Sequence, residues 1–188
     1  MYSRPKINFC KSCGASTVYR LPDDGDTKER AVCTSSACGI VHYENPLNVV
    51  GTIPYLEKNG KPHILMCLRN IEPRKGKWTL PAGFMELGET TSQGAARETQ
   101  EEAGAQIEMQ ELFTVLSVPL VGQVHLFYRA KLLSEVYDPG HETIEVRLFA
   151  EDELPWDEMA FRTIKTTIKH FFEDAKAGAF KLHERDLV

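Results

Sequence analysis

Several features that mark other protein classes are missing from this sequence of 188 residues. It has no apolar run near the roughly 18 residues of a membrane-spanning helix, so we expect no membrane partner. Residues 1–10 lack the apolar stretch of a signal peptide, which favours a cytoplasmic location. Internal repeats and low-complexity segments are also absent. With 42% hydrophobic residues, the composition and length fit one folded domain with a small appendage.

Positive charge is in deficit, with 22 Lys+Arg against 27 Asp+Glu and a net charge of −5. The segment from Glu86 to Glu111 holds seven Glu and only one basic residue. A chain that exposes such a block would repel a polyanion, so we expect no binding of duplex nucleic acid. The segment is either a solvated helix face or a cation site, and the spacing of its carboxylates decides between the two.

Four of the five cysteines lie in two close pairs, Cys10 with Cys13 and Cys33 with Cys38. Two such pairs on short hairpins can supply four thiolates to a tetrahedral Zn²⁺ ion, so we predict a zinc ribbon. Two disulfides are the alternative, but they are typical of secreted proteins and would leave Cys67 over. Because four thiolates leave no open coordination position, we expect the zinc to stabilise a small segment rather than to catalyse a reaction.

Asn45-Pro46 marks the expected domain boundary, because the residue before a proline is disfavoured in a helix. We therefore expect the zinc ribbon in residues 1–44 and a second domain in residues 45–188. In that domain a helix should follow a capping box at Thr90 and end at Gly104, and an ordered loop should span residues 74–88. The expected elements are strands at 48–57, 63–69, 112–118, 123–132 and 145–150, and helices at 91–103 and 157–175. This order predicts a mixed α/β sandwich.

The acidic segment has helical spacing. Glu98, Glu101 and Glu102 stand at positions i, i+3 and i+4, so their carboxylates share one face of a helix. Like charges this close destabilise a helix unless a cation lies among them. Oxygen ligands suit Mg²⁺ or Mn²⁺, and Mg²⁺ completes its shell with water and substrate phosphate. The spacing therefore predicts a divalent-cation site that attracts a phosphorylated substrate.

Residues 83–105 resemble the Nudix box, which reads G-x5-E-x7-R-E-U-x-E-E-x-G-U with U an aliphatic residue. The sequence departs from the pattern at Thr99, which takes the first aliphatic position, and at the small Ala105, which takes the second. The resemblance implies a Nudix-type α/β/α sandwich with a mixed sheet, preceded by the zinc ribbon. It also implies a homodimer.

The same resemblance implies an activity, the hydrolysis of a nucleoside diphosphate linked to another moiety by attack of water. The bound Mg²⁺ or Mn²⁺ would neutralise the diphosphate and orient the water. The implied metal ligands are Glu98, Glu101, Glu102 and the carbonyl of Gly83. Arg97 and Glu89 would form an ion pair that braces the loop against the helix.

A general base is expected in the loop before the strand at 145–150. The family often draws a further metal-binding or catalytic glutamate from this region. Glu142 is the preferred candidate because it lies in the loop, Glu145 is the second, and His141 is a weaker alternative.

The flanks of the motif bear on the substrate. The zinc ribbon also occurs in NADH pyrophosphatases, but their Ser-Gln-Pro-Trp-Pro-Phe-Pro signature is absent, because residues 116–123 read Leu-Ser-Val-Pro-Leu-Val-Gly-Gln. Runs along the whole chain resemble plant chloroplast FAD and ADP-ribose pyrophosphatases and their bacterial relatives, although the cysteine spacing differs. That resemblance implies release of AMP from FAD or ADP-ribose.

Four residues near the motif are candidates for substrate contacts. Arg69 and Arg74 could bind phosphate oxygens, or equally could simply be solvated. Trp78 and Phe84 could stack on an aromatic ring, although a tryptophan in such a strand-like setting is more often a core residue. Two other functions stay open: an NADH pyrophosphatase-like activity, and a nucleic-acid or protein binding module with a vestigial Nudix domain. The intact set of three glutamates argues against the second.

Overall fold

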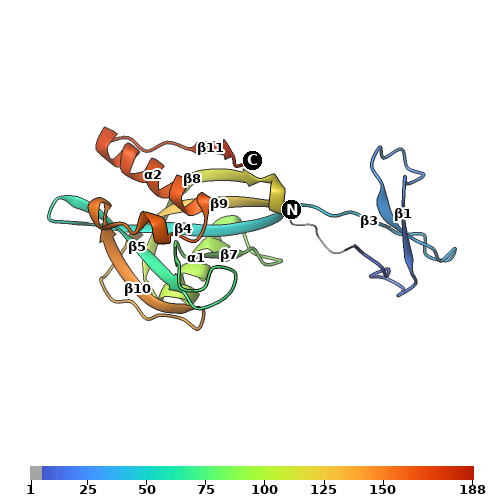
Figure 1. Cartoon of the computed structure of the whole chain (residues 1–188), viewed down its shortest axis with the longest axis horizontal. Helices are drawn as coiled ribbons and strands as arrows, with labels where there is room; N and C mark the ends of the chain where they lie inside the picture. Colours follow the sequence, from blue (N-terminus) through green and yellow to red (C-terminus); the bar gives the residue numbers. More distant parts are fainter. Residues whose placement is uncertain (1–5) are drawn as a thin grey trace. The chain divides into compact units, whose positions relative to one another are not determined.

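The structure is a computed structural model that describes residues 6–188, and it divides into two compact units between Pro46 and Leu47 (Figure 1). In the first unit, β1 (Thr17–Arg20), β2 (Arg30–Cys33) and β3 (Val41–His42) form an antiparallel sheet in the order β1-β2-β3. Its buried residues are few, chiefly in β2, and include Cys10 and Cys33. So small a core needs a metal or a covalent link to hold it.

The second unit is built on an eight-stranded sheet whose main path is β10-β5-β4-β9-β8-β11. The short β6 pairs with β5, and β7 pairs with β4. Its strands are β4 (Leu47–Lys58), β5 (Lys61–Arg69), β6 (Trp78–Thr79), β7 (Ala82–Phe84), β8 (Ile107–Val118), β9 (Gln123–Leu132), β10 (Thr143–Ala150) and β11 (His183–Asp186). The sheet is mixed, because the pairs β4–β9 and β8–β11 are parallel and the other pairs are antiparallel.

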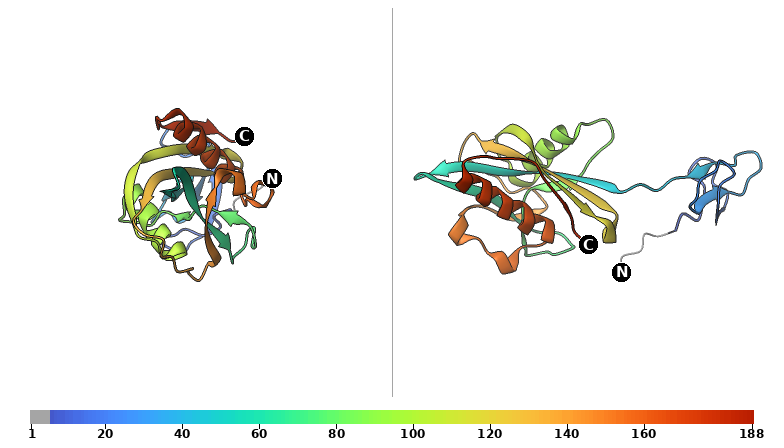
Figure 2. Two further views of the ribbon diagram at one scale, coloured as in Figure 1. Left: turned by 90° about the vertical axis from the view of Figure 1, so that its left-hand side faces the viewer. Right: turned by 90° about the horizontal axis from the view of Figure 1, so that it is seen from above.

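Two helices, α1 (Thr91–Ala103) and α2 (Arg162–Ala177), cover opposite faces of this sheet (Figure 2). The larger core lies under α2, where Phe113, Phe127 and Phe171 are at most 1% exposed. A smaller core under α1 includes Cys67, which is 1% exposed as expected of a strand residue. The predicted α/β/α sandwich with a mixed sheet is confirmed.

Several expected boundaries were wrong. The last helix begins at Arg162 rather than at Asp157, which lies in a 3-10 turn at Trp156–Glu158. Between the two, Ala160 donates a backbone hydrogen bond to Trp78 in β6, so the chain stays extended there. The loop expected at residues 74–88 contains β6 and β7, and the strands expected at 112–118 and 145–150 begin earlier, at Ile107 and Thr143.

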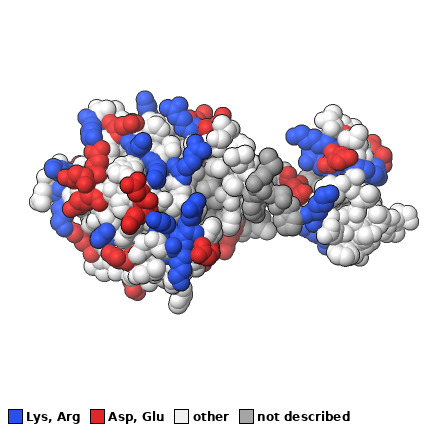
Figure 3. All heavy atoms as spheres, viewed as in Figure 1, with Lys and Arg blue, Asp and Glu red and all other residues white. Residues whose placement is uncertain are grey.

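The surface carries both signs of charge, and acidic and basic side chains are intermixed on the face of the second unit that Figure 3 shows. Glu111, the last residue of the acidic segment, forms an ion pair with Arg129 at 2.6 Å. Within residues 6–188, neither helix is long and apolar enough to cross a bilayer.

Candidate active site

The acidic residues lie on a helix with well-defined ends. Thr90 and Gln93 form the expected capping box, and Gly104 ends α1 in the left-handed conformation, with φ 57°. Glu98, Glu101 and Glu102 occupy the last two turns, and no basic residue lies in the last turn. The C-terminal end of a helix carries partial negative charge, so it destabilises carboxylates placed there. Three glutamates at this end therefore cost stability unless a cation offsets their charge.

Glu102 is the most buried of the three, at 6% exposed. Its Oε2 accepts a hydrogen bond of 3.1 Å from the backbone N–H of Ala82, at the start of β7. Burial raises the pKa of Glu102 to about 8; the charges of Glu98 and Glu142 add to the rise, and the Ala82 N–H and Arg69 oppose it. Burial thus disfavours the charged form of this carboxyl group, and a cation bound beside it would restore the ionised form.

Gly83 lies against the carboxylate of Glu98. A Cβ at position 83 would come within 2.4 Å of the carboxylate carbon and of both its oxygens, so only glycine fits there without displacing Glu98. Burial also raises the pKa of Glu98, against the pull of the neighbouring Arg97. The backbone of β7 and the carboxylates of α1 thus share one confined space.

Arg97 connects the loop to the helix. Its Nε and Nη2 each donate a hydrogen bond of 3.0 Å to the two carboxylate oxygens of Glu89, and its Nη2 also reaches the carbonyl of Phe84. Its Nη1 donates to Glu98 at 2.8 Å and to Glu101 at 3.0 Å. The brace between Arg97 and Glu89 is therefore present, and the same guanidinium also neutralises part of the glutamate cluster.

The glutamate cluster fits a hard divalent cation by the chemistry of its donors. All of its side-chain donors are oxygens, and their mutual repulsion would be relieved by a positive ion. Among the described residues, however, only the four cysteines bring three or more ligand atoms within 4.8 Å of one another. Arg97 explains the difference, because its Nη1 lies between Glu98 and Glu101 where a cation would compete with it.

The loop before β10 packs against the end of α1. The N–H groups of Asp138 and Gly140 donate to the carbonyls of Ala103 and Glu102, at 2.9 and 3.2 Å. A Cβ on Gly140 would lie 1.8 Å from the carbonyl oxygen of Glu101, so the two backbones are in direct contact. These bonds occupy helix carbonyls that would otherwise lack partners.

The same loop brings Glu142 toward the glutamates of α1. Its charge contributes to the raised pKa values of both Glu98 and Glu102. Glu145 instead lies opposite Leu68 of β5, on the face that packs under α2, and its carboxylate is 3.8 Å from Arg147. This placement puts Glu145 on the other face of the sheet from the glutamates of α1. His141 is exposed, and its backbone carbonyl accepts a hydrogen bond from an asparagine side chain.

The four candidates for substrate contact differ in exposure. Trp78 is 4% exposed and packs edge-on against Phe149, with a guanidinium on its ring, so its expected stacking on substrate is corrected to a core role. Arg69 is 9% exposed, its Nε donates to a loop carbonyl, and its charge acts on Glu102. Arg74 is exposed, and Phe84 is 53% exposed.

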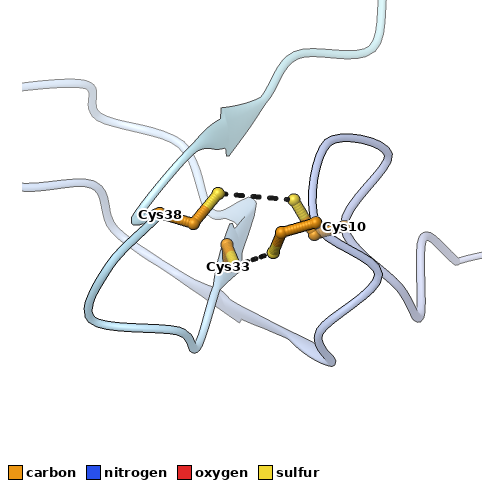
Figure 4. A group of neighbouring side chains, drawn as sticks. Cys10, Cys33 and Cys38 are labelled. Carbon is orange, nitrogen blue, oxygen red and sulfur yellow. Dashed lines mark hydrogen bonds between the residues drawn. The ribbon is translucent and has the colours of Figure 1, made fainter.

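The cysteines of the first unit form a second cluster. The Sγ atoms of Cys10 and Cys38 are 3.8 Å apart, and those of Cys13 and Cys33 are 3.4 Å apart (Figure 4). All five cysteines of the chain are free thiols. A tetrahedral site with Zn–S distances of about 2.3 Å places its sulfurs roughly 3.8 Å apart, so the four thiols fit zinc. The backbone N–H of Cys13 lowers the pKa of Cys10 to about 6, which favours the thiolate.

The sequence did not reveal how α1 is attached to the sheet. The hydroxyl of Thr99 lies 2.7 Å from that of Thr52 in β4, and the hydroxyl of Thr91 lies 2.6 Å from that of Tyr128 in β9. Thr99 is the residue that departs from the aliphatic pattern of the motif, and this polar contact explains why a hydroxyl is accommodated there. A threonine at an apolar helix position was the available signal, but its partner is 47 residues away.

Two family models match the chain. The model of the Nudix domain matches residues 46–173, and the Nudix N-terminal model, a zinc ribbon, matches residues 8–44. A solved NUDIX hydrolase from Nitrosomonas europaea is 46% identical, covers 96% of this chain and 99% of its own, and superposes with a TM-score of 0.89.

Curated relatives carry more specific names. The NAD-capped RNA hydrolase NudC of Stutzerimonas stutzeri is 31% identical over 150 residues, which are 78% of this chain and 49% of the relative. The ADP-ribose pyrophosphatase of Methanocaldococcus jannaschii is 41% identical over 64 residues, which are 34% of this chain and 37% of the relative. The chain spans about half the length of the curated relatives that it matches.

Proposed function

Because this chain belongs to the Nudix family, as residues 83–105 predicted, we propose that it is a metal-dependent pyrophosphatase of ADP-linked metabolites. It would hydrolyse the diphosphate bond of ADP-ribose or FAD and release AMP. One observation carries the proposal: three glutamates gather at the negative end of α1, against the backbone of β7, where burial raises the pKa of two of them. Such an arrangement is costly in a protein that does not bind a cation.

In this proposal Glu98, Glu101 and Glu102, with the carbonyl of Gly83, hold Mg²⁺ or Mn²⁺. The cation would neutralise the diphosphate and stabilise the leaving oxygen. Arg97 on the helix would hold the loop in place through Glu89. Its two hydrogen bonds of 3.0 Å to the Glu89 carboxylate support this role.

Glu142 is the proposed general base, which takes a proton from the attacking water at a carboxylate oxygen. Its position supports this role better than that of Glu145, because its charge acts on the glutamate cluster. The exposed Arg74 would bind phosphate oxygens of the substrate. The buried Arg69 would also add positive charge near the phosphates, and its charge acts on Glu102 as well.

Zinc bound by Cys10, Cys13, Cys33 and Cys38 would stabilise the first unit. We also propose a homodimer in the cytoplasm that binds neither duplex nucleic acid nor a membrane.

A second substrate class is favoured by the relatives named NAD-capped RNA hydrolase. NADH, or an RNA end that carries NAD, presents the same ADP-linked diphosphate. The absence of the NADH pyrophosphatase signature at residues 116–123 supports ADP-ribose and FAD as the first choice.

The test is hydrolysis of ADP-ribose, FAD and NADH with Mg²⁺ or Mn²⁺, with release of AMP as the measurement. Glu101→Gln and Glu102→Gln should each lower turnover by orders of magnitude with the fold retained. Glu108→Gln is the matched control, because Glu108 is exposed on β8, outside the cluster, and the charge change is the same. Folded protein that releases no AMP from any of the three compounds would overturn the proposal.

A further inference from the structure

The two edge strands of the large sheet differ in length and in side chains. At one edge, β11 has four residues, all of them polar or charged. At the other edge, β10 has eight residues, which include Ile144, 48% exposed, and the half-buried Val146 and Leu148 (Figure 1). A short, charged edge resists pairing with another chain, whereas a long edge with apolar side chains is a template for a further strand. The β10 edge is therefore the one to which a strand could be added.

Hydrogen bonds at the end of β5 show which of its backbone groups face β10. The N–H of Arg69 donates to the carbonyl of Lys77 on the β6 side, and the N–H of Asn70 donates to the carbonyl of Glu142, just before β10. Successive N–H groups of a strand point to its two opposite edges in turn. The even-numbered residues of β5 therefore bond to β10, and the odd-numbered residues bond to the strands on the other side.

The register then identifies the backbone groups of β10 that point out of the sheet. Glu145 and Arg147 lie opposite even-numbered residues of β5, so their backbone groups bond within the sheet, and those of Val146 and Leu148 point outward. Within residues 6–188, no hydrogen bond reaches the outward N–H of Val146 or of Leu148. The next outward N–H, on Ala150, donates to a glutamate carboxylate of the following 3-10 turn at 3.0 Å. The free part of the edge is thus centred on Val146 and Leu148.

Two side chains of opposite charge flank Val146 on the α2 face of β10. The side chains of Glu145 and Arg147 are 48% and 53% exposed. The guanidinium of Arg147 lies 4.3 Å from the ring centroid of Phe149 and 4.9 Å from that of Trp78, and these contacts hold it on this face. When two copies of a strand pair about a two-fold axis, residue i of one copy faces residue j of the other, and j faces i. A glutamate and an arginine placed symmetrically about a central residue are therefore complementary to their own copy.

One antiparallel register matches both the backbone groups and the charges. With Val146 on the two-fold axis, its outward N–H and C=O face those of its copy, and Glu145 of each strand faces Arg147 of the other. An axis at Arg147 or at Glu145 would set like charges opposite each other, which is destabilising. An axis at Leu148 would pair Val146 with Ala150, whose outward N–H already has a partner. Charge and hydrogen bonding thus select the same register.

We propose that β10 is the interface of a homodimer of this chain, in which the two copies of β10 pair antiparallel with Val146 on the two-fold axis. The strands exchange backbone hydrogen bonds at the axis, and each glutamate faces an arginine on either side of it. Leu148 of each copy faces Ile144 of the other, so pairing covers apolar side chains that are now exposed or half-buried. This inference gives an interface to the homodimer proposed above, and it does not depend on the proposed reaction.

A single pair of strands makes a small interface. Stable complexes bury about 800 Å² on each partner, and the few facing residues of two strands bury less. The dimer should therefore dissociate on dilution. Because its ion pairs are half exposed, salt should also weaken it by screening their attraction.

The experiment is sedimentation equilibrium over a wide range of protein concentration, which measures the dissociation constant of the dimer. Glu145→Arg and Arg147→Glu each replace both facing pairs with like charges, so each should raise the dissociation constant by roughly tenfold or more. An equimolar mixture of the two variants should dimerise as wild type does, because two arginines on one strand then face two glutamates on the other. Glu184→Arg is the matched control, because Glu184 is exposed on β11 and the charge change equals that of Glu145→Arg. Its dissociation constant should equal that of wild type.

Hydrogen exchange gives a second readout that needs no variant. The amide protons of Val146 and Leu148 should exchange more slowly at concentrations where the wild-type protein is dimeric than where it is monomeric. Circular dichroism checks that the variants are folded. If loss of the aromatic contacts unfolds Arg147→Glu, Glu145→Arg and the exchange of these two amides decide the question.

Four results would overturn the proposal: wild-type protein that is monomeric at every concentration, a dimer that Glu145→Arg does not weaken, a control that is weakened equally, or amide exchange at Val146 and Leu148 that does not depend on concentration. Folded variants that stay monomeric when mixed would overturn the register. None of these measurements uses hydrolysis, so a failure of the proposed reaction leaves the interface standing.

Discussion

Two threonine hydroxyls join α1 to the sheet, and their geometry allows a quantitative prediction for Thr99→Val. Thr99 Oγ1 donates to the carbonyl of Ala95 at 2.8 Å, so its own proton is used within the helix. The bond of 2.7 Å to Thr52 is therefore one in which Thr52 donates and Thr99 accepts. Both residues are 0% exposed, so water cannot replace either partner.

The two single substitutions should differ in cost. Thr99→Val leaves a buried donor on Thr52 without its acceptor, which costs about 1–3 kcal/mol. Thr52→Val leaves the Thr99 proton bonded to Ala95 and removes one neutral hydrogen bond, which costs about 0.5–1.5 kcal/mol. The double variant replaces both hydroxyls with methyl groups of nearly the same shape, and its stability should lie within about 1 kcal/mol of wild type.

Denaturant unfolding of the four proteins, followed by far-UV circular dichroism, measures these differences and gives the coupling energy of the pair. A loss of about 2 kcal/mol corresponds to a fall in Tm of about 4–8 °C for a chain of this size. A double variant whose loss equals the sum of the two single losses would show that the hydroxyls do not depend on each other, and the assignment of donor and acceptor would then be refuted.

Four further predictions follow from particular contacts. Gly94→Ala would place a Cβ 2.5 Å from a carboxylate oxygen of the loop before α1 and should lower both Tm and turnover, whereas wild-type values would contradict the close packing. His125→Leu should remove a pH dependence of unfolding: the unfolded chain protonates near pH 6.5 but the folded ring only near pH 4, so stability falls by about 1.4 kcal/mol per unit as pH falls through that window. A slope that persists in the variant would assign it elsewhere. His183→Ala removes the 2.9 Å bond to Asp174 and should raise hydrogen exchange in β11 before other strands; uniform exchange would argue against this anchor. Cys13→Ser should reduce bound zinc, measured by elemental analysis, from near one per chain, and metal-free wild-type protein with disulfides would exclude the zinc ribbon.

The sequence predicted α1 accurately because both of its end signals are local. Thr90 and Gln93 form the capping box within four residues, and Gly104 supplies the left-handed end, so no distant contact is needed to define this helix. The regular geometry of the helix also places the side chains of Glu98, Glu101 and Glu102 on one face. The part of the site that lies on α1 could therefore be predicted from residue spacing alone.

The other half depends on partners far along the chain. Nothing near Glu145 indicates that it lies on the α2 face of the sheet, because its orientation is set by the pairing of β10 with β5. Likewise the start of the last helix is displaced to Arg162 by a backbone bond to Trp78, more than 80 residues earlier. Trp78 itself belongs to the core because β6 joins the sheet, and its aromatic ring, which could have stacked on substrate, gave no sign of its partner Phe149, 71 residues along the chain.

The loop that carries Glu142 is constrained by backbone contacts more than by side chains. Gly140 touches the carbonyl of Glu101, and two N–H groups of the loop satisfy the last carbonyls of α1. An insertion or a side chain at position 140 would therefore release both the proposed base and the end of the helix that carries the glutamates. Homologues should consequently vary little in length between residues 138 and 142, and new substrate preferences should evolve through other loops, such as Pro119–Val121 at the far end of β8.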